Sequence, residues 1–269
     1  MLRTLFARLQ CRTKAFNFPL NFQGVSVDEE VLRTRYVPMN QRCRLSMSNI
    51  FEEDLAEGFG FAFKNFLAAL EERDLTFLKH VCEPTLFKEL EKSVGQLTGS
   101  EWYVESDFTE DEVDFNMKYT SFSFIYGVNP NRQTNRPKNE YEYFNLFNIK
   151  NGIDLHFYKP LFEFKHCLPF LRVSCLFSCP NGVYLKNKDG SVILGQTSTS
   201  YHKIIFEGMG RTCHRNEDFE EAQRNIWKCM SNFESEEKLQ MIRKIFQVEN
   251  MTWKVADIDN YMNGNPYVN

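Results

Sequence analysis

Several patterns that would assign a function directly are missing from this sequence. No apolar run approaches the ~18 to 20 residues of a membrane-spanning helix, because charges interrupt the longest apolar stretches, as in FGFAFKNFLAAL. Basic residues are not in excess either: the net charge is −4 and the isoelectric point about 5.8. Since nucleic-acid binding takes most of its affinity from Lys and Arg on phosphates, this balance argues against a DNA partner and disfavours an RNA partner.

The eight cysteines include no Cys-x-x-Cys pair. Cys175 and Cys179 lie in an alternating stretch, FLRVSCLFSC, which is typical of a strand. Four residues of strand span ~13 Å, whereas a disulfide needs Cα atoms within roughly 7 Å. Cys213 and His214 are adjacent but lack further ligands at a zinc spacing. We therefore expect free thiols and no metal site, which suits a reducing compartment such as the mitochondrial matrix.

The stretch DGSVILGQTS, residues 189–198, has the glycine spacing of a phosphate-binding loop but carries Gln196 where that loop has lysine. Its interior and the following STSYHKIIFEG both favour strands, whereas a phosphate loop leads into a helix. Asp189-Gly190 is instead a signal for a tight turn with positive φ. We expect a hairpin here and no nucleotide cofactor.

No acidic residue precedes Asp28, which sets the N-terminus apart from the rest of the chain. Basic residues and apolar residues at helical spacing share its first part, namely Arg3, Arg8, Arg12 and Lys14 with Leu2, Leu5, Phe6 and Leu9. A basic, acid-free amphipathic start is typical of mitochondrial targeting segments, although an ordinary basic terminal helix has the same pattern. We expect residues 1–16 to be such a targeting segment. Residues 17–50, punctuated by Pro and Asn without a lasting period, are predicted to form an extended connector.

Residues from about 50 to 97 have the pattern of three closely linked helices. Ser48 or Asn49 can cap the first one, with acids at 52–54 in its first turn. Its apolar positions recur every three or four residues at Leu55, Phe59, Phe63, Phe66 and Leu70. Gly58 and Gly60 lower its helix propensity but leave room for close packing. Asp74 can cap a short second helix, LTFLKHVC, and Pro84 opens a third, PTLFKELEKSV.

After these helices, aromatic and β-branched stretches predict strands. They are EWYVESDF, KYTSFSFIYGV, YEYFNLFNI, FLRVSCLFSC and the hairpin region, and MTWKVADIDNY closes the series. Two amphipathic helices form an insertion at about 212–250, the second capped by Ser235. This order of elements predicts a single α+β domain over 51–258, followed by a polar tail at 259–269.

Three stretches of this domain resemble a known family. In AFKNFLAALEERDLTFLKHVCEPTLFKELEKSV, a long helix ends at Asp74-Leu75 and a short helix leads to the step CEPTLF. The other two stretches are VYLKNKDGSVILGQ, with its Asp-Gly turn, and WKVADID. Over 51–258 the chain is similar to the C-terminal domain family of the 44-kDa subunit of the mitochondrial translocase of the inner membrane.

This resemblance implies a nuclear-transport-factor-2-like, or cystatin-like, fold, in which a curved, mostly antiparallel sheet forms a cone around a long first helix. The family also includes a mitoribosomal large-subunit protein that tethers the ribosome to the inner membrane, and related domains occur as accessory subunits of respiratory complexes. The chain lacks the long charged N-terminal region of the import protein, and it is acidic where a ribosomal protein should be basic. Its insertion at about 212–250 is also longer than the family pattern.

Some enzymes share the cone fold and line the cone with acids and tyrosines, which makes Glu105 and Asp107 the candidates for catalysis. They belong to ESDFTEDEVD, which carries six acids in ten residues, a pattern typical of a solvated or partner-facing loop. His156, His166, His202 and His214 have no serine or cysteine nucleophile at a recognisable spacing. We therefore expect no catalytic residue, no cofactor and no metal.

The expected function is that of a non-catalytic accessory subunit, peripheral on the matrix face of a mitochondrial inner-membrane assembly. A respiratory-chain complex fits the acidic balance and the short connector best. The alternatives are a mitoribosomal membrane tether, an import-motor component, and a small-molecule enzyme of the cone fold.

Partner subunits, with inner-membrane lipid as a further contact, are expected to meet the apolar stripe of the first late helix. The residues singled out are Phe219, Ile226, Trp227, Met230 and Phe233. Trp227 lies beside Ile226 and widens the stripe beyond what one packed face needs. Packing on the domain's own core is the other interpretation of this stripe.

Overall fold

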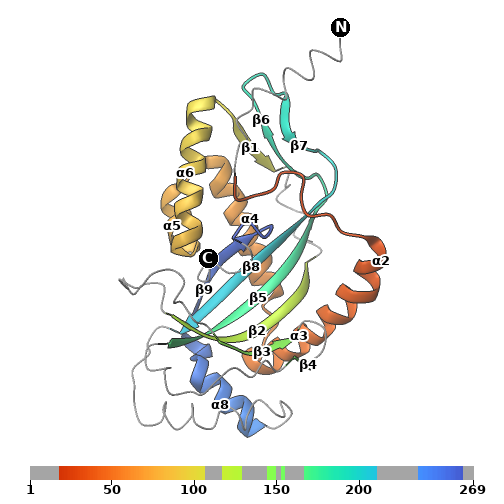
Figure 1. Cartoon of the computed structure of the whole chain (residues 1–269), viewed down its shortest axis with the longest axis vertical. Coiled ribbons are helices and arrows are strands. Elements are labelled where there is room, and N and C mark those ends of the chain that lie inside the picture. Colours follow the sequence, from red (N-terminus) through yellow and green to blue (C-terminus); the bar gives the residue numbers. More distant parts are fainter. Residues whose placement is uncertain are drawn as a thin grey trace.

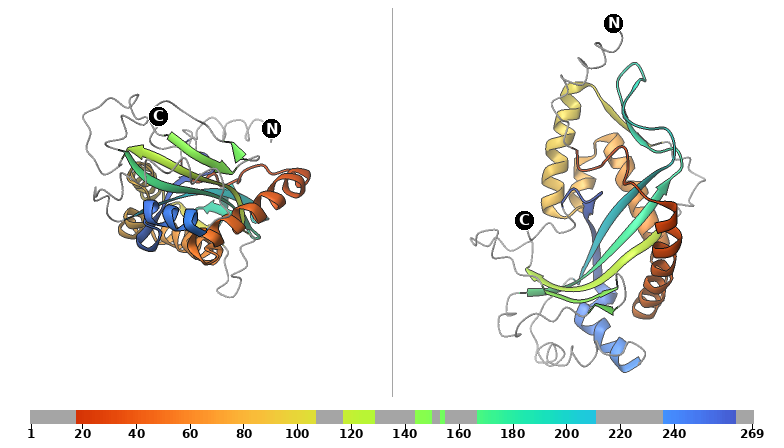
Figure 2. Two further views of the ribbon diagram at one scale, coloured as in Figure 1. Left: turned by 90° about the horizontal axis from the view of Figure 1, so that it is seen from below. Right: turned by 45° about the vertical axis from the view of Figure 1, so that its right-hand side comes forward.

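A computed structural model describes residues 18–106, 117–128, 144–149, 153–154, 167–210 and 236–262. Its centre is a six-stranded antiparallel sheet in the order β4-β3-β2-β5-β8-β9, and a smaller sheet has the order β1-β6-β7. The strands are β1 (Tyr103–Ser106), β2 (Lys118–Val128), β3 (Phe144–Ile149), β4 (Ile153–Asp154), β5 (Cys167–Cys179), β6 (Val183–Lys186), β7 (Val192–Gly195), β8 (Ser200–Gly210) and β9 (Met251–Ile258). Helices α3 (Val37–Phe51), α4 (Ala56–Glu72) and α8 (Glu236–Phe246) lie on one face of the large, twisted sheet (Figures 1 and 2).

Strand β5 shows why the sheet buries the face that it does. Leu171, Val173, Cys175, Phe177 and Cys179 alternate along it and are all fully buried. Alternation places them on one face of the sheet, where the ring of Phe177 stacks on Phe63 of α4 at 4.5 Å between centroids. The strand prediction for FLRVSCLFSC is therefore confirmed, and Cys175 and Cys179 are free thiols, as expected.

Helix α4 supplies the other half of the core. The predicted stripe of Phe59, Phe63, Phe66 and Leu70 is buried, because positions three and four apart lie on one face of a helix. Phe59 stacks on Phe206 of β8 at 4.5 Å between centroids. The helix ends at Arg73, whose φ of 59° is left-handed.

The predicted extended connector at 17–50 is wrong, because a long helix occupies most of it. The helix comprises α2 (Glu29–Val31), the π-helical turn η1 (Leu32–Tyr36) and α3. Polar residues between the apolar ones hide the helical pattern in the sequence. The residues that the helix buries nevertheless recur every three or four positions: Met39, Cys43, Met47 and Ile50. Pro38, which suggested a break, is the second residue of α3, close behind the π-helical turn, where the ordinary hydrogen-bond ladder is already interrupted.

The predicted cap of α4 at Ser48 or Asn49 is also wrong. Both residues lie inside α3, which ends at Glu52 in a left-handed conformation with φ of 62°. Helix α4 begins afresh at Ala56, whose backbone N–H donates to Asp54 Oδ1 at 3.0 Å. The acids at 52–54 therefore form a turn between two helices rather than the first turn of one.

The next two helices match the sequence prediction. Asp74 caps α5 (Leu75–Val81) by accepting the N–H groups of Thr76 and Phe77 at 3.0 and 2.9 Å. Pro84 is the first residue of α6 (Pro84–Ser100), where its missing N–H leaves no partner unsatisfied. Both helices pack beside β9.

The hairpin prediction for DGSVILGQTS is confirmed. Strands β6 and β7 pair antiparallel, and the turn between them is closed by Gly190 N–H on Asn187 O at 3.1 Å. Gly190 has φ of 83°, a left-handed conformation that L side chains adopt only with strain.

The late part of the domain is described from residue 236 on. The second helix of the expected insertion is α8, and the short η4 (Val248–Asn250) leads into β9, which confirms the closing strand. The first helix of the insertion, the residue Ser235 predicted to cap the second, the targeting segment 1–16 and most of the tail lie outside the described residues. The fold is thus α+β, with antiparallel sheets and a long helix, α4, at the start of the expected domain, as predicted at that level; the helix at residues 29–51 was not predicted.

Candidate functional site

An apolar groove lies between α4, α5 and β9. Its volume is about 320 Å³. Its walls come from Phe59 and Ala62 of α4, Phe77 and Val81 of α5, and Trp253 and Val255 of β9. The polar side chains at this groove are those of Asn65 and Lys254. Such a lining can hold an apolar side chain or ligand, but it offers no set of acids or bases for chemistry.

Two residues of α4 shape the mouth of the groove. Phe61 lines it and is 70% exposed, which is exceptional for a phenylalanine beside a packed core. Gly58 also lines it, and a Cβ added there would meet no atom within 4 Å. The groove therefore combines a projecting ring with an unfilled space one turn away on the same helix.

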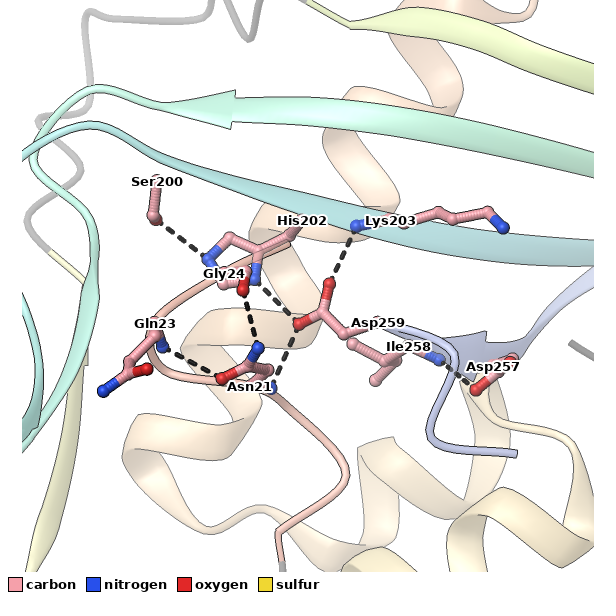
Figure 3. Close-up of polar contacts among 9 residues, drawn as sticks. All are labelled: Asn21, Gln23, Gly24, Ser200, His202, Lys203, Asp257, Ile258 and Asp259. Atoms are coloured by element: carbon pink, nitrogen blue, oxygen red, sulfur yellow. Dashed lines mark hydrogen bonds and ion pairs between the residues drawn. The ribbon is translucent and has the colours of Figure 1, made fainter. Parts of the chain in front are cut away.

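A second, polar cluster joins β8 to the end of β9 and to the N-terminal segment (Figure 3). Ser200 Oγ lies 2.9 Å from His202 Nε2, and His202 Nδ1 lies 3.0 Å from Asp259 Oδ2. Asp259 also accepts the backbone N–H groups of Asn21 at 3.0 Å and Lys203 at 2.8 Å. The first three side chains have the connectivity of a hydrolase triad, in which serine, histidine and acid are linked in series.

This cluster is closed to substrate, because Ser200 is 2% exposed and the His202 side chain is fully buried. The chain at Gly24 passes over it: a Cβ on Gly24 would lie 2.7 Å from Tyr201 O and 3.3 Å from Ser200 Cβ. Val25 N–H donates to Tyr201 O at 2.7 Å and continues that contact. The polar cluster therefore joins three segments of chain: the stretch at residues 21–25, β8 and the end of β9. A nucleophile at Ser200 could not reach an external carbonyl.

A buried ion pair crosses the other face of the sheet. Arg172 of β5 and Glu207 of β8 are direct cross-strand neighbours, and Arg172 Nε donates to Glu207 Oε1 at 3.0 Å. The charge of Glu207 also acts on a third acid, Glu83, which caps α6: burial raises the pKa of Glu83, and the charge of Glu207 raises it further. Because either charge alone would be costly to bury, the pair favours the strand register that brings Arg172 opposite Glu207.

The described cysteines are unsuited to nucleophilic chemistry. Burial raises the pKa of Cys43 and Cys179 to about 12, and it raises the pKa of Cys82 and Cys175 as well. A thiol reacts as its thiolate, so these groups behave as small apolar side chains. Within the described ranges, no three His, Cys, Asp or Glu residues are grouped so that they could hold a metal ion.

The residues singled out from the sequence have different outcomes. Glu105 pairs with Lys186 and accepts the hydroxyl of Tyr184 at 2.9 Å, so it links β1 to β6. His202 belongs to the polar cluster. Outside the described residues lie Asp107, His156, His166, His214 and the whole expected partner stripe of Phe219, Ile226, Trp227, Met230 and Phe233.

Sequence reasoning missed both the groove and the cluster. Ser200 and His202 stand two apart on a strand, a visible signal of a shared face. Their partner Asp259 is 57 residues beyond His202 and was assigned to the polar tail. The groove takes its walls from α4, α5 and β9, with Phe206 of β8, and its local signal is a phenylalanine off the buried stripe of α4.

Among the residues with described structure, no helix has the length and apolar character needed to cross a bilayer. Comparison of the chain with protein-family models, with curated proteins and with solved structures finds no match.

Proposed function

We propose that this chain is a non-catalytic accessory subunit of a large mitochondrial inner-membrane assembly, on the matrix side, and that the assembly is a respiratory-chain complex. The observation that carries the proposal is the long N-terminal helix. None of residues 29–38 is buried, although all of them are helical. We call residues 29–38 the helical arm.

The arm exposes apolar side chains that a partner could bury. It continues into α3, which packs on the sheet, so its own exposed face is free for another protein. The exposed apolar side chains of Val31 and Val37 lie on the arm, and Leu45 is exposed further along the same helix. In Figure 1 the helix runs from beneath the sheet to its right-hand side, and its first turn, α2, stands clear of the strands. A neighbouring subunit that packs on the arm would bury these side chains.

The proposed family supports the same assignment. The translocase-44-like domain and the cone-shaped, nuclear-transport-factor-2-like fold are compatible with a long helix that packs into a twisted antiparallel sheet, as α4 does here. Domains of that family act by holding assemblies together. The matrix location is proposed from the basic, acid-free segment 1–16.

The alternative of another class, a small-molecule enzyme, would have to use the polar cluster or the groove. Ser200 and His202 are buried beneath the N-terminal segment, and the groove walls are apolar. Neither arrangement presents an acid or base to a bound substrate. An accessory role therefore fits the described residues better.

Native-gel fractionation of inner membranes from cells that make the protein, with mass spectrometry of each band, tests the proposal. We expect the chain to co-migrate with a respiratory complex. Migration with the large mitoribosomal subunit or the import motor would favour one of those alternatives, and migration as a free protein would refute the accessory role.

A matched pair of variants tests the arm itself. Val31→Asp with Val37→Asp should leave the domain folded, because neither side chain is buried, and should release the subunit from its complex. Val192→Asp on the hairpin makes the same chemical change at another exposed valine and should leave assembly unchanged. Full assembly of the arm variant would show that the arm is not the docking element.

A further inference from the structure

The outer face of α4 carries a projecting ring and a hollow within one helical turn. Phe61 is 70% exposed at the rim of the α4–α5–β9 groove, whose volume is about 320 Å³. The groove is bounded by Phe59, Phe77 and Trp253, so it presents aromatic and aliphatic surface. A phenyl ring is therefore the kind of group that it would accept.

Gly58 leaves the hollow open, and neither its backbone conformation nor its neighbours require a glycine there. Its φ is not left-handed, and a Cβ at this position would meet nothing within 4 Å. Glycine in a helix is destabilising relative to alanine because of its greater freedom in the unfolded chain. The missing side chain at Gly58 thus leaves room beside the helix and is not needed for the helix to pack.

Two opposite charges flank Phe61 on the same helix. Glu57 precedes it by four residues and Lys64 follows it by three, so the three side chains lie along one side of α4. Glu57 is exposed and Lys64 half-buried, and neither makes an ion pair within the part of the chain that the structure describes.

This order of charge, ring and charge is complementary to itself. When two copies of α4 lie antiparallel about a two-fold axis near Phe61, Glu57 of each copy faces Lys64 of the other. A two-fold interface uses the same patch on both subunits, so each contact occurs twice. The patch supplies both the ring that projects and the hollow that receives it.

We propose that the chain forms a two-fold dimer in which Phe61 of each copy enters the α4–α5–β9 groove of the other, guided by the paired charges of Glu57 and Lys64. A buried phenylalanine contributes ~150–250 Å², so two rings with the groove rims give an interface at the small end of the known range. The dimer is accordingly weak and depends on concentration. This inference is independent of the proposed accessory role.

Sedimentation velocity of the full chain over a concentration series, at low ionic strength, measures the dimer dissociation constant. Phe61→Ala should raise that constant at least ~30-fold, because a central aromatic anchor is lost twice. Leu45→Ala is the control, since Leu45 is also exposed, at 66%, but lies on α3 away from the groove. It should leave the constant unchanged. Filling the hollow with Gly58→Leu should weaken the dimer while the domain stays folded.

Reversing the charges of Glu57 and Lys64 tests whether the occupant of the groove is a second copy of this chain. Glu57→Lys and Lys64→Glu should each weaken the dimer several-fold by placing like charges opposite one another, an effect that salt screens. The double reversal should restore it, because the pairs are re-formed with their signs exchanged. A chain that is monomeric at all concentrations, a Phe61→Ala variant that dimerises like wild type, or a double reversal without recovery would overturn the proposal. The first of these results would leave the groove to a different partner or to an apolar ligand.

Discussion

Replacing Asp259 by alanine removes the acceptor of three hydrogen bonds, one from Asn21 and two from His202 and Lys203 of β8. The buried His202 Nδ1–H loses its partner, at a cost of about 1–3 kcal/mol for a buried donor. The half-buried N–H of Lys203 costs about 1 kcal/mol, whereas the exposed N–H of Asn21 can turn to water. Asp259 also has φ of 52°, where alanine adds about 1 kcal/mol of strain.

These contributions predict a loss of about 3–5 kcal/mol in the free energy of unfolding, a large share of the ~5–15 kcal/mol that holds a typical domain together. Urea unfolding followed by both far-UV circular dichroism and tryptophan fluorescence measures the loss, and coincident transitions would justify a two-state treatment. Asp259→Asn is the control. It keeps one acceptor oxygen and tolerates the left-handed backbone, so it should cost about half as much or less. An alanine variant within about 1 kcal/mol of wild type, or an asparagine variant that is equally damaging, would refute the clamp role of Asp259.

Three further predictions concern other parts of the chain. Gly190→Ala should lower the free energy of unfolding by about 1 kcal/mol, from the φ of 83° alone, since its Cβ would meet no neighbour; in the same series magnesium-ATP should give no thermal shift, and a saturable shift would contradict the hairpin interpretation. Burial raises the pKa of Glu83 above its ordinary 4.5, so the folded state holds a proton that the unfolded state releases, and stability falls as pH rises from about 4.5. Glu83→Gln should remove this loss of stability. Parallel pH profiles of the two proteins in urea unfolding would disprove the role of Glu83. Residues 1–16 should direct a fluorescent protein to mitochondria, and replacing Arg3, Arg8 and Arg12 by Glu should abolish import, which unchanged localisation by microscopy would contradict.

Local signals carried the prediction of elements wherever one residue decides the backbone. Asp74 accepts two orphan N–H groups, Pro84 occupies a position that needs no N–H, and Gly190 supplies a positive φ. Each of these effects acts over three or four residues, so the sequence alone suffices to predict it. Strand β5 was equally accessible, because Leu171, Val173, Cys175, Phe177 and Cys179 recur at every second position.

The long N-terminal helix was missed because the information for it is not local. Its buried residues pack against β2 and α8, which are remote in sequence, and its mean hydropathy is low since most of its surface is exposed. Pro38 suggested a break, and only the preceding π-helical turn explains how the helix continues. Propensity is overridden in this way whenever tertiary packing decides an element.

The groove and the polar cluster share the same difficulty. Each joins residues that are ordinary in their own segments: Phe61 resembles one more core phenylalanine, and Asp259 one more polar residue after a strand. Their roles arise from placement, because β9 brings Trp253 to α4 and carries Asp259 to His202. Pairings across such distances in sequence follow from the topology of the sheet, which no single stretch specifies.

The polar cluster also determines how the arm is held. Asn21 and Val25 bond to Asp259 and to Tyr201, which fixes the chain only four residues before α2 begins at Glu29. At its other end the same helix packs along β2 and buries Met39, Cys43 and Met47. A helix attached to the sheet at both ends cannot swing independently of it, so a partner bound on residues 29–38 would be oriented rigidly relative to the whole domain. Loosening the cluster through Asp259 should therefore weaken assembly through the arm as well as the fold, although no arm residue is altered.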